Sequence, residues 1–85
     1  MLISDEIHAK LAAVFTTSVL EVADTSEGHR GHAGWREGGQ THFRVTITSE
    51  ALTPLSRLQR HRAIHDSLGK DLIGRIHALE LIVNA

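Results

Sequence analysis

The chain has 85 residues, a formal net charge of −1 and a hydrophobic content of 41%, which indicates one small domain, residues 1–85, with one modest core. The near-zero charge gives no global attraction to nucleic acid or to an anionic membrane, and no apolar run approaches the ~20 residues that span a bilayer. With no cysteine, and no basic and apolar leader in its first ten residues, we expect a cytoplasmic protein without disulfides or membrane partners.

The first predicted element is a helix, because apolar residues recur at three- and four-residue steps at Ile3, Ile7, Leu11 and Val14. Ser4 is its expected N-terminal cap. A strand rich in β-branched residues is predicted at 16–23. A glycine-rich loop at 24–40 follows and carries His29 and His32. Loops of this length are usually functional or disordered, so these two histidines are of interest.

The second predicted strand covers 41–48 and alternates clearly. Phe43, Val45 and Ile47 would face the core, while His42, Arg44, Thr46 and Thr48 would face solvent. After a short helical turn in "SEAL", a helix is predicted with Pro54 in its first turn and Gly74 as its C-terminal cap. Along one side of that helix lie Leu58, His61, His65, Leu68 and Leu72.

The last predicted strand covers 76–83, with His77, Leu79, Leu81 and Val83 on one face. A helix between the last two strands permits a crossover, so these strands are expected to be parallel. We therefore predict an α+β domain in which helices cover one face of a three-stranded mixed sheet. Its core would pack Phe43, Val45 and Ile47 against Leu11, Val14, Leu68 and Leu72.

The sequence contains no pattern typical of an enzyme. It has no cysteine nucleophile, G-x-S-x-G, P-loop or HExxH motif, so no enzymatic activity is expected. Seven histidines are the unusual feature. Each has an ordinary interpretation. His8 would be solvated, His42 would bond to a neighbour, and His61 and His65 would be core histidines. His29 and His32 would be ordinary polar residues of a loop, and His77 would be a hydrogen-bonded core histidine at the start of a strand. The alternative is that His77 and a loop histidine converge on a metal, with further ligands from another molecule.

Three segments, "THFRV", "LQRHRAIHDSL" and "IHALEL", resemble the BolA family in this order, and the match runs from "LEVAD" to "IHALEL". The resemblance implies an αββααβ fold similar to class II KH domains and no enzymatic activity. It also implies a partnership with monothiol glutaredoxins in iron–sulfur cluster trafficking, assembly or iron and redox regulation. The two proteins would share a [2Fe-2S] cluster, to which the glutaredoxin side contributes its cysteine and a glutathione thiolate.

The resemblance also implies the ligands from this chain. They are the histidine of the H-A-L motif, here His77, and one histidine of the loop between the first two strands. His29 and His32 are both candidates, with a slight preference for His32 because Gly31 and Gly34 flank it. Without its partner the chain is expected to be a monomer or a weak homodimer.

The alternative function is DNA binding by a transcriptional regulator, through the helix after Pro54. Its candidate residues are Arg57, Arg60, His61 and Arg62, which are spaced so that they can contact phosphates. The ordinary interpretation is a solvated helix face, which the net charge of −1 favours. Binding to duplex DNA is therefore expected to be weak and largely independent of sequence.

Overall fold

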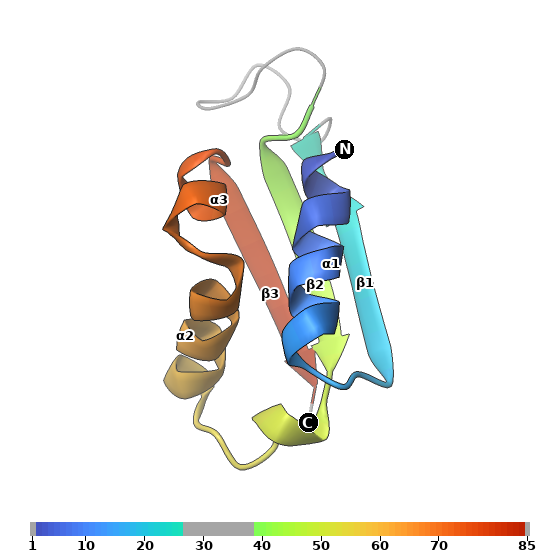
Figure 1. The fold of residues 1–85 in the computed structure, drawn as a ribbon, viewed down its shortest axis with the longest axis vertical. Helices are drawn as coiled ribbons and strands as arrows, with labels where there is room; N and C mark the ends of the chain where they lie inside the picture. Colours follow the sequence, from blue (N-terminus) through green and yellow to red (C-terminus); the bar gives the residue numbers. More distant parts are fainter. Residues whose placement is uncertain (1, 27–38, 85) are drawn as a thin grey trace.

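The computed structural model describes residues 2–26 and 39–84. Helix α1 (Ile3–Val14) is followed by strands β1 (Val19–Asp24) and β2 (His42–Thr48) and by a short 3₁₀ helix, η2 (Glu50–Leu52). Helices α2 (Arg57–Leu68) and α3 (Lys70–Gly74) then lead into strand β3 (Ala78–Asn84). The α-helices form one layer against the sheet (Figure 1). The predicted α+β architecture, with the order helix, two strands, helices and strand, is confirmed.

The sheet has the order β1-β2-β3. β1 pairs with β2 antiparallel, and β2 pairs with β3 parallel, so the predicted mixed sheet is confirmed. In the parallel pair His42 lies opposite Ala78 and Thr48 lies opposite Asn84. This register brings the first residues of β2 and β3 together at one end of the sheet, which is where the histidine-bearing segments meet.

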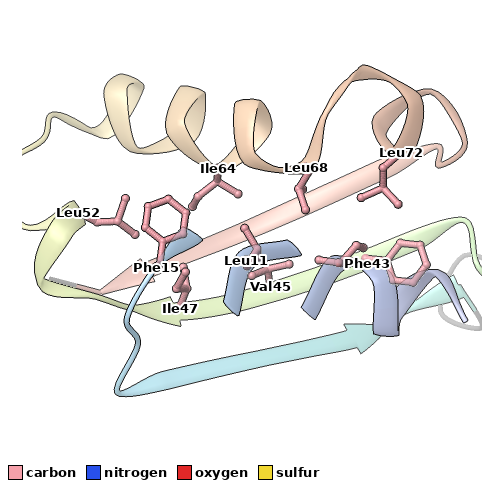
Figure 2. Close-up of a cluster of buried hydrophobic side chains, with 10 residues drawn as sticks. Leu11, Phe15, Phe43, Val45, Ile47, Leu52, Ile64, Leu68 and Leu72 are labelled. Carbon is pink, nitrogen blue, oxygen red and sulfur yellow. The ribbon is translucent and has the colours of Figure 1, made fainter. Parts of the chain in front are cut away.

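The core lies between the helices and the inward face of β2 (Figure 2). Phe43, Val45 and Ile47 are at most 1% exposed, as their alternation predicts. They pack in one cluster with seven residues from the helices and their connections: Ile7, Leu11, Phe15, Leu52, Ile64, Leu68 and Leu72. Removing so many side chains from water is the main term that stabilises a domain of this size.

The prediction that Val14 belongs to the core is wrong. Val14 is 58% exposed, and Phe15 takes its place at 9% exposed. Ile7, Leu11 and Phe15 are four residues apart, so they follow one line down the helix, whereas Val14 lies to its side. α1 also ends at Val14, and the extended backbone of Phe15 (φ −112°, ψ 136°) leads into the connection to β1.

The predicted cap of α1 is also wrong. The helix begins at Ile3, and no side chain at its first residues accepts a capping hydrogen bond. The Ile3 N–H donates instead to Oε1 of Gln40, at 2.8 Å. A residue from the far side of the loop thus satisfies one of the open N–H groups of the helix.

The predicted inward stripe of the second helical region is wrong at two positions. Leu58 is 58% exposed and His65 is exposed, whereas Ile64 and Leu68 are fully buried. The helix does not have Pro54 in its first turn: Pro54 lies in the turn before it, and Ser56 and Gln59 form a capping box at its start. Gly69, with φ 84°, then separates α2 from α3. Leu72 therefore reaches the core from a second helix, and the residues of the predicted stripe do not lie on one continuous helix.

The remaining expected elements differ in their bounds. The turn in "SEAL" is η2, and β1 begins at Val19 rather than at residue 16. Gly74 is the last residue of α3 rather than its cap. Within residues 2–26 and 39–84, no helix has the length and apolar character needed to cross a bilayer.

Candidate functional site

His77 lies in the short connection between α3 and β3, one residue before the strand begins, and it is exposed. Its N–H donates to the carbonyl of Thr41 at 2.8 Å, and the N–H of Ala78 donates to the same oxygen at 3.1 Å. These two bonds fix the backbone of His77 against the residue that precedes β2. The prediction that His77 belongs to the third strand is wrong, because the strand begins one residue later, at Ala78. His77 is exposed, whereas Leu79, Leu81 and Val83, which were predicted on the same face, are half-buried.

The predicted exposure of the His42 side chain is wrong. It was predicted to face solvent, but it is only 3% exposed. Its Nδ1 lies 2.8 Å from Oγ1 of Thr41, and its ring centroid lies 5.1 Å from that of His77, with a tilt of 52°. The predicted bond to a neighbour is thus present, and the burial arises because the parallel register brings the segment before β3 against the start of β2.

A polar network joins the two described ends of the loop between β1 and β2. Asp24 Oδ1 accepts the N–H of Ser26 at 2.9 Å. Asp24 Oδ2 accepts both the backbone N–H of Gln40, at 3.0 Å, and its side-chain amide, at 2.9 Å. Burial acts to raise the pKa of Asp24, but hydrogen bonds from Ser26 and Gln40 outweigh it and hold this pKa below its ordinary value.

Two residues at the far end of this loop have a backbone that demands special conformations. Gly39 and Gln40 have φ of 76° and 64°. A Cβ on Gly39 would meet Oδ2 of Asp24 at 3.0 Å, so the chain approaches the carboxylate closely only because glycine is there. Gln40 tolerates its unusual φ because its side chain bonds both to Asp24 and to the start of α1. His29 and His32 lie between these ends and outside the described residues.

The donors of the described residues do not make a complete metal site. In residues 2–26 and 39–84, no three His, Cys, Asp or Glu side chains are grouped so that they could hold an ion. Where β2 and β3 begin, the structure places one exposed imidazole, that of His77, beside a buried one, that of His42. Imidazole is a good ligand for iron, so this donor set fits one ligand position of a centre that other ligands complete.

The candidate DNA-binding residues do not form one open basic face. Arg57 and Arg62 are exposed, and His61 is half-buried. The guanidinium of Arg60 donates to the carbonyls of Leu52, at 2.8 Å, and Thr53, at 2.9 Å. Arg60 therefore ties η2 and the following turn to α2, which leaves Arg57 and Arg62 as the exposed arginines of the set.

Comparison with known proteins gives consistent results. The family model described as "BolA-like protein" matches residues 11–85. The chain is 41% identical over 75 residues to BolA-like protein 1 of Mus musculus, a match that covers 88% of this chain but only 52% of the mouse protein. It is 38% identical over 81 residues to the DNA-binding transcriptional regulator BolA of Escherichia coli (strain K12), covering 95% of this chain and 73% of that protein.

The fold has a close structural counterpart. The BolA domain of SufE1 from Arabidopsis thaliana superposes with a TM-score of 0.80 at 34% identity, covering 95% of this chain and 88% of that one. The sequence resemblance and the three-dimensional resemblance thus extend over nearly the same residues.

Proposed function

Because this chain belongs to the BolA-like protein family, we propose that it is a partner of a monothiol glutaredoxin and contributes histidine ligands to a shared [2Fe-2S] cluster. The proposed ligands are His77 and either His29 or His32. The cluster would be handed on or sensed rather than used for catalysis by this chain. The carrying observation is His77 itself: an exposed imidazole whose backbone is fixed by two hydrogen bonds to Thr41.

The chemistry of the chain agrees with a shared centre. It has no cysteine, and its described residues hold no group of three metal-binding side chains, so thiolates from a partner would complete the coordination. Glutaredoxin cysteine and glutathione would supply them. Replacing a thiolate by an imidazole removes negative charge from such a cluster and raises its reduction potential. A chain that binds through histidine would thus change the properties of the cluster that its partner carries.

The test mixes the protein with a monothiol glutaredoxin, glutathione, iron and sulfide and records the visible spectrum. The wild-type protein should change the spectrum of the glutaredoxin cluster, and His77→Ala should abolish that change. His8→Ala is the matched control, because His8 is also an exposed histidine but lies on α1. Single changes at His29 or His32 should weaken the mixed species, and the double change should remove it. An unaltered spectrum with His77→Ala would show that this histidine is not a ligand.

DNA binding is a second candidate function, favoured by the name of the Escherichia coli relative and by the exposure of Arg57 and Arg62. Two exposed arginines in a chain of net charge −1 support contacts to phosphates rather than base readout. Affinity for duplex DNA should therefore fall steeply between low and physiological salt and differ little between sequences. A tight complex with one sequence that persists at physiological salt would place DNA binding first.

A further inference from the structure

We propose that His42 is a positioning residue for His77: Thr41 holds it as the Nε2–H tautomer, and the ring so fixed orients the exposed imidazole of His77. The tautomer and the ring contact belong to this chain alone. Their consequence for an iron–sulfur cluster rests on the function proposed above.

The first step concerns the freedom of His77. Its backbone is fixed, but an exposed histidine side chain would ordinarily sample several rotamers. Here its ring lies 5.1 Å from that of His42, within the range in which aromatic rings attract one another. Since His42 is 3% exposed, it cannot move away without opening the end of the sheet. The buried ring therefore restricts where the exposed one can point.

The second step assigns the protons of the network. Oγ of Ser26 accepts the N–H of Thr41 at 3.0 Å and the N–H of His42 at 3.1 Å. A hydroxyl oxygen has two lone pairs, so these two bonds occupy both of them. Although Thr41 Oγ1 lies 3.1 Å from Ser26 Oγ, its proton has no lone pair to approach there.

The Thr41 proton is therefore donated to the other neighbour, Nδ1 of His42, at 2.8 Å. A ring nitrogen that accepts a hydrogen bond carries no proton, so Nε2 carries it. Ser26, Thr41 and His42 are each at most 3% exposed, so water is poorly placed to replace any member of the network. Because both lone pairs of Ser26 Oγ are occupied, the network of buried atoms favours the Nε2–H tautomer of His42.

This assignment separates the roles of the two histidines. In the selected tautomer, Nδ1 of His42 is engaged by Thr41 and Nε2 bears a hydrogen, so neither nitrogen presents a lone pair to a metal. His77, which is exposed, is left as the ligand candidate. A phenylalanine in place of His42 would keep the ring but leave the buried Thr41 hydroxyl without its acceptor, which explains why histidine serves here.

The tautomer is tested on the protein without glutaredoxin or cluster. Long-range ¹H–¹⁵N correlation spectra of histidine-labelled protein, at a single neutral pH, distinguish protonated from unprotonated ring nitrogens. His42 should show Nδ1 as the unprotonated nitrogen, and Thr41→Val should lose this preference. A proton on Nδ1 of His42 in the wild-type protein would overturn the assignment, whatever the mixed cluster does.

The positioning role is tested on the mixed complex by the rate at which it loses its visible spectrum under a chelator. His42→Ala removes the ring that restricts the side chain of His77. The mixed complex of this variant should therefore lose its visible spectrum about two- to tenfold faster than the wild-type complex. His42→Phe keeps the ring and should recover part of the lifetime, and His8→Ala should have no effect. Circular dichroism checks that each variant is folded. If His42→Ala does not fold, Thr41→Val carries the test, because it removes the hydrogen bond from Thr41 to the ring without removing the ring, and it should shorten the lifetime.

Wild-type lifetimes in the folded variants would refute the positioning role. If the wild-type protein forms no mixed species at all, the proposed function fails, and the tautomer experiment decides the remaining claim separately.

Discussion

Replacing Phe43 by alanine is the sharpest perturbation of the fold. Phe43 is 1% exposed in the middle strand of the sheet and packs in the same cluster as helix residues such as Leu68 and Leu72 (Figure 2). Truncating a buried phenylalanine costs about 3–5 kcal/mol, from the lost transfer free energy and the cavity that remains. A domain of this size is stabilised by about 4–13 kcal/mol in total, so the variant should be near the limit of folding.

Urea unfolding followed by circular dichroism measures this loss. Leu58→Ala is the matched control, because Leu58 was predicted on the same side of the helix as Leu68 and Leu72 but is 58% exposed. Its substitution should change the free energy of unfolding by less than about 0.5 kcal/mol, as is usual for surface positions. The reasoning is refuted if Phe43→Ala and Leu58→Ala unfold at similar urea concentrations.

Three further predictions concern the backbone, the loop network and the basic helix. Gly69→Ala should lower the free energy of unfolding by about 1–3 kcal/mol, because φ 84° with ψ 156° is a backbone region that only glycine adopts readily. Gly74→Ala, in a helix with open space at its Cβ, should be neutral or stabilising. Equal melting temperatures of the two variants would contradict this prediction. Asp24 has a lowered pKa in the folded state, so its contribution to stability is present above the unfolded pKa near 3.8 and is lost as the pH falls through the folded pKa. The acid limb of the stability profile should therefore flatten in Asp24→Asn, and an unchanged limb would count against the network. Arg60→Gln should lower the melting temperature because it removes the hydrogen-bond donors to the carbonyls of Leu52 and Thr53. Arg62→Gln should leave the melting temperature unchanged and weaken any DNA binding at low salt, because Arg62 is exposed. The reverse pattern would contradict a structural role for Arg60 and a phosphate-binding role for Arg62.

The sequence was most informative where one local pattern decides the structure. Alternation alone placed Phe43, Val45 and Ile47 on the buried face of β2, because side chains of a strand point to opposite faces in turn. It was least informative at helix boundaries. Val14 and Phe15 are adjacent apolar residues, and both the four-residue line from Ile7 through Leu11 and the end of α1 at Val14 favour Phe15 as the buried one. The stripe predicted along one helix was misjudged for a similar reason, since α2 ends at Leu68 and a second helix, α3, begins after Gly69.

The candidate site was predicted only in part, for a physical reason. His77 was singled out because its motif resembles that of a family, not because its spacing required a ligand. The burial of His42 depends on the parallel register, which joins residues 36 positions apart in the chain, His42 and Ala78. No local periodicity contains that pairing. "THF" and "HAL" would have indicated the contact only if the two strands had been aligned at their first residues.

Helix α1 contributes no ligand candidate, but it contacts the segments that lead into β2 and β3, where His42 and His77 lie. Gln40, at the end of the loop, accepts the N–H of Ile3. Arg75, two residues before His77, donates to both carboxylate oxygens of Glu6 at 2.9 and 3.0 Å, and this hydrogen-bonded pairing lowers the pKa of Glu6. The segments that precede β2 and β3 are thus both attached to the first turns of α1. Because bidentate pairs fix geometry as well as adding energy, the Arg75–Glu6 pair, together with the Gln40–Ile3 bond, holds the backbone that precedes His77 and His42 against α1.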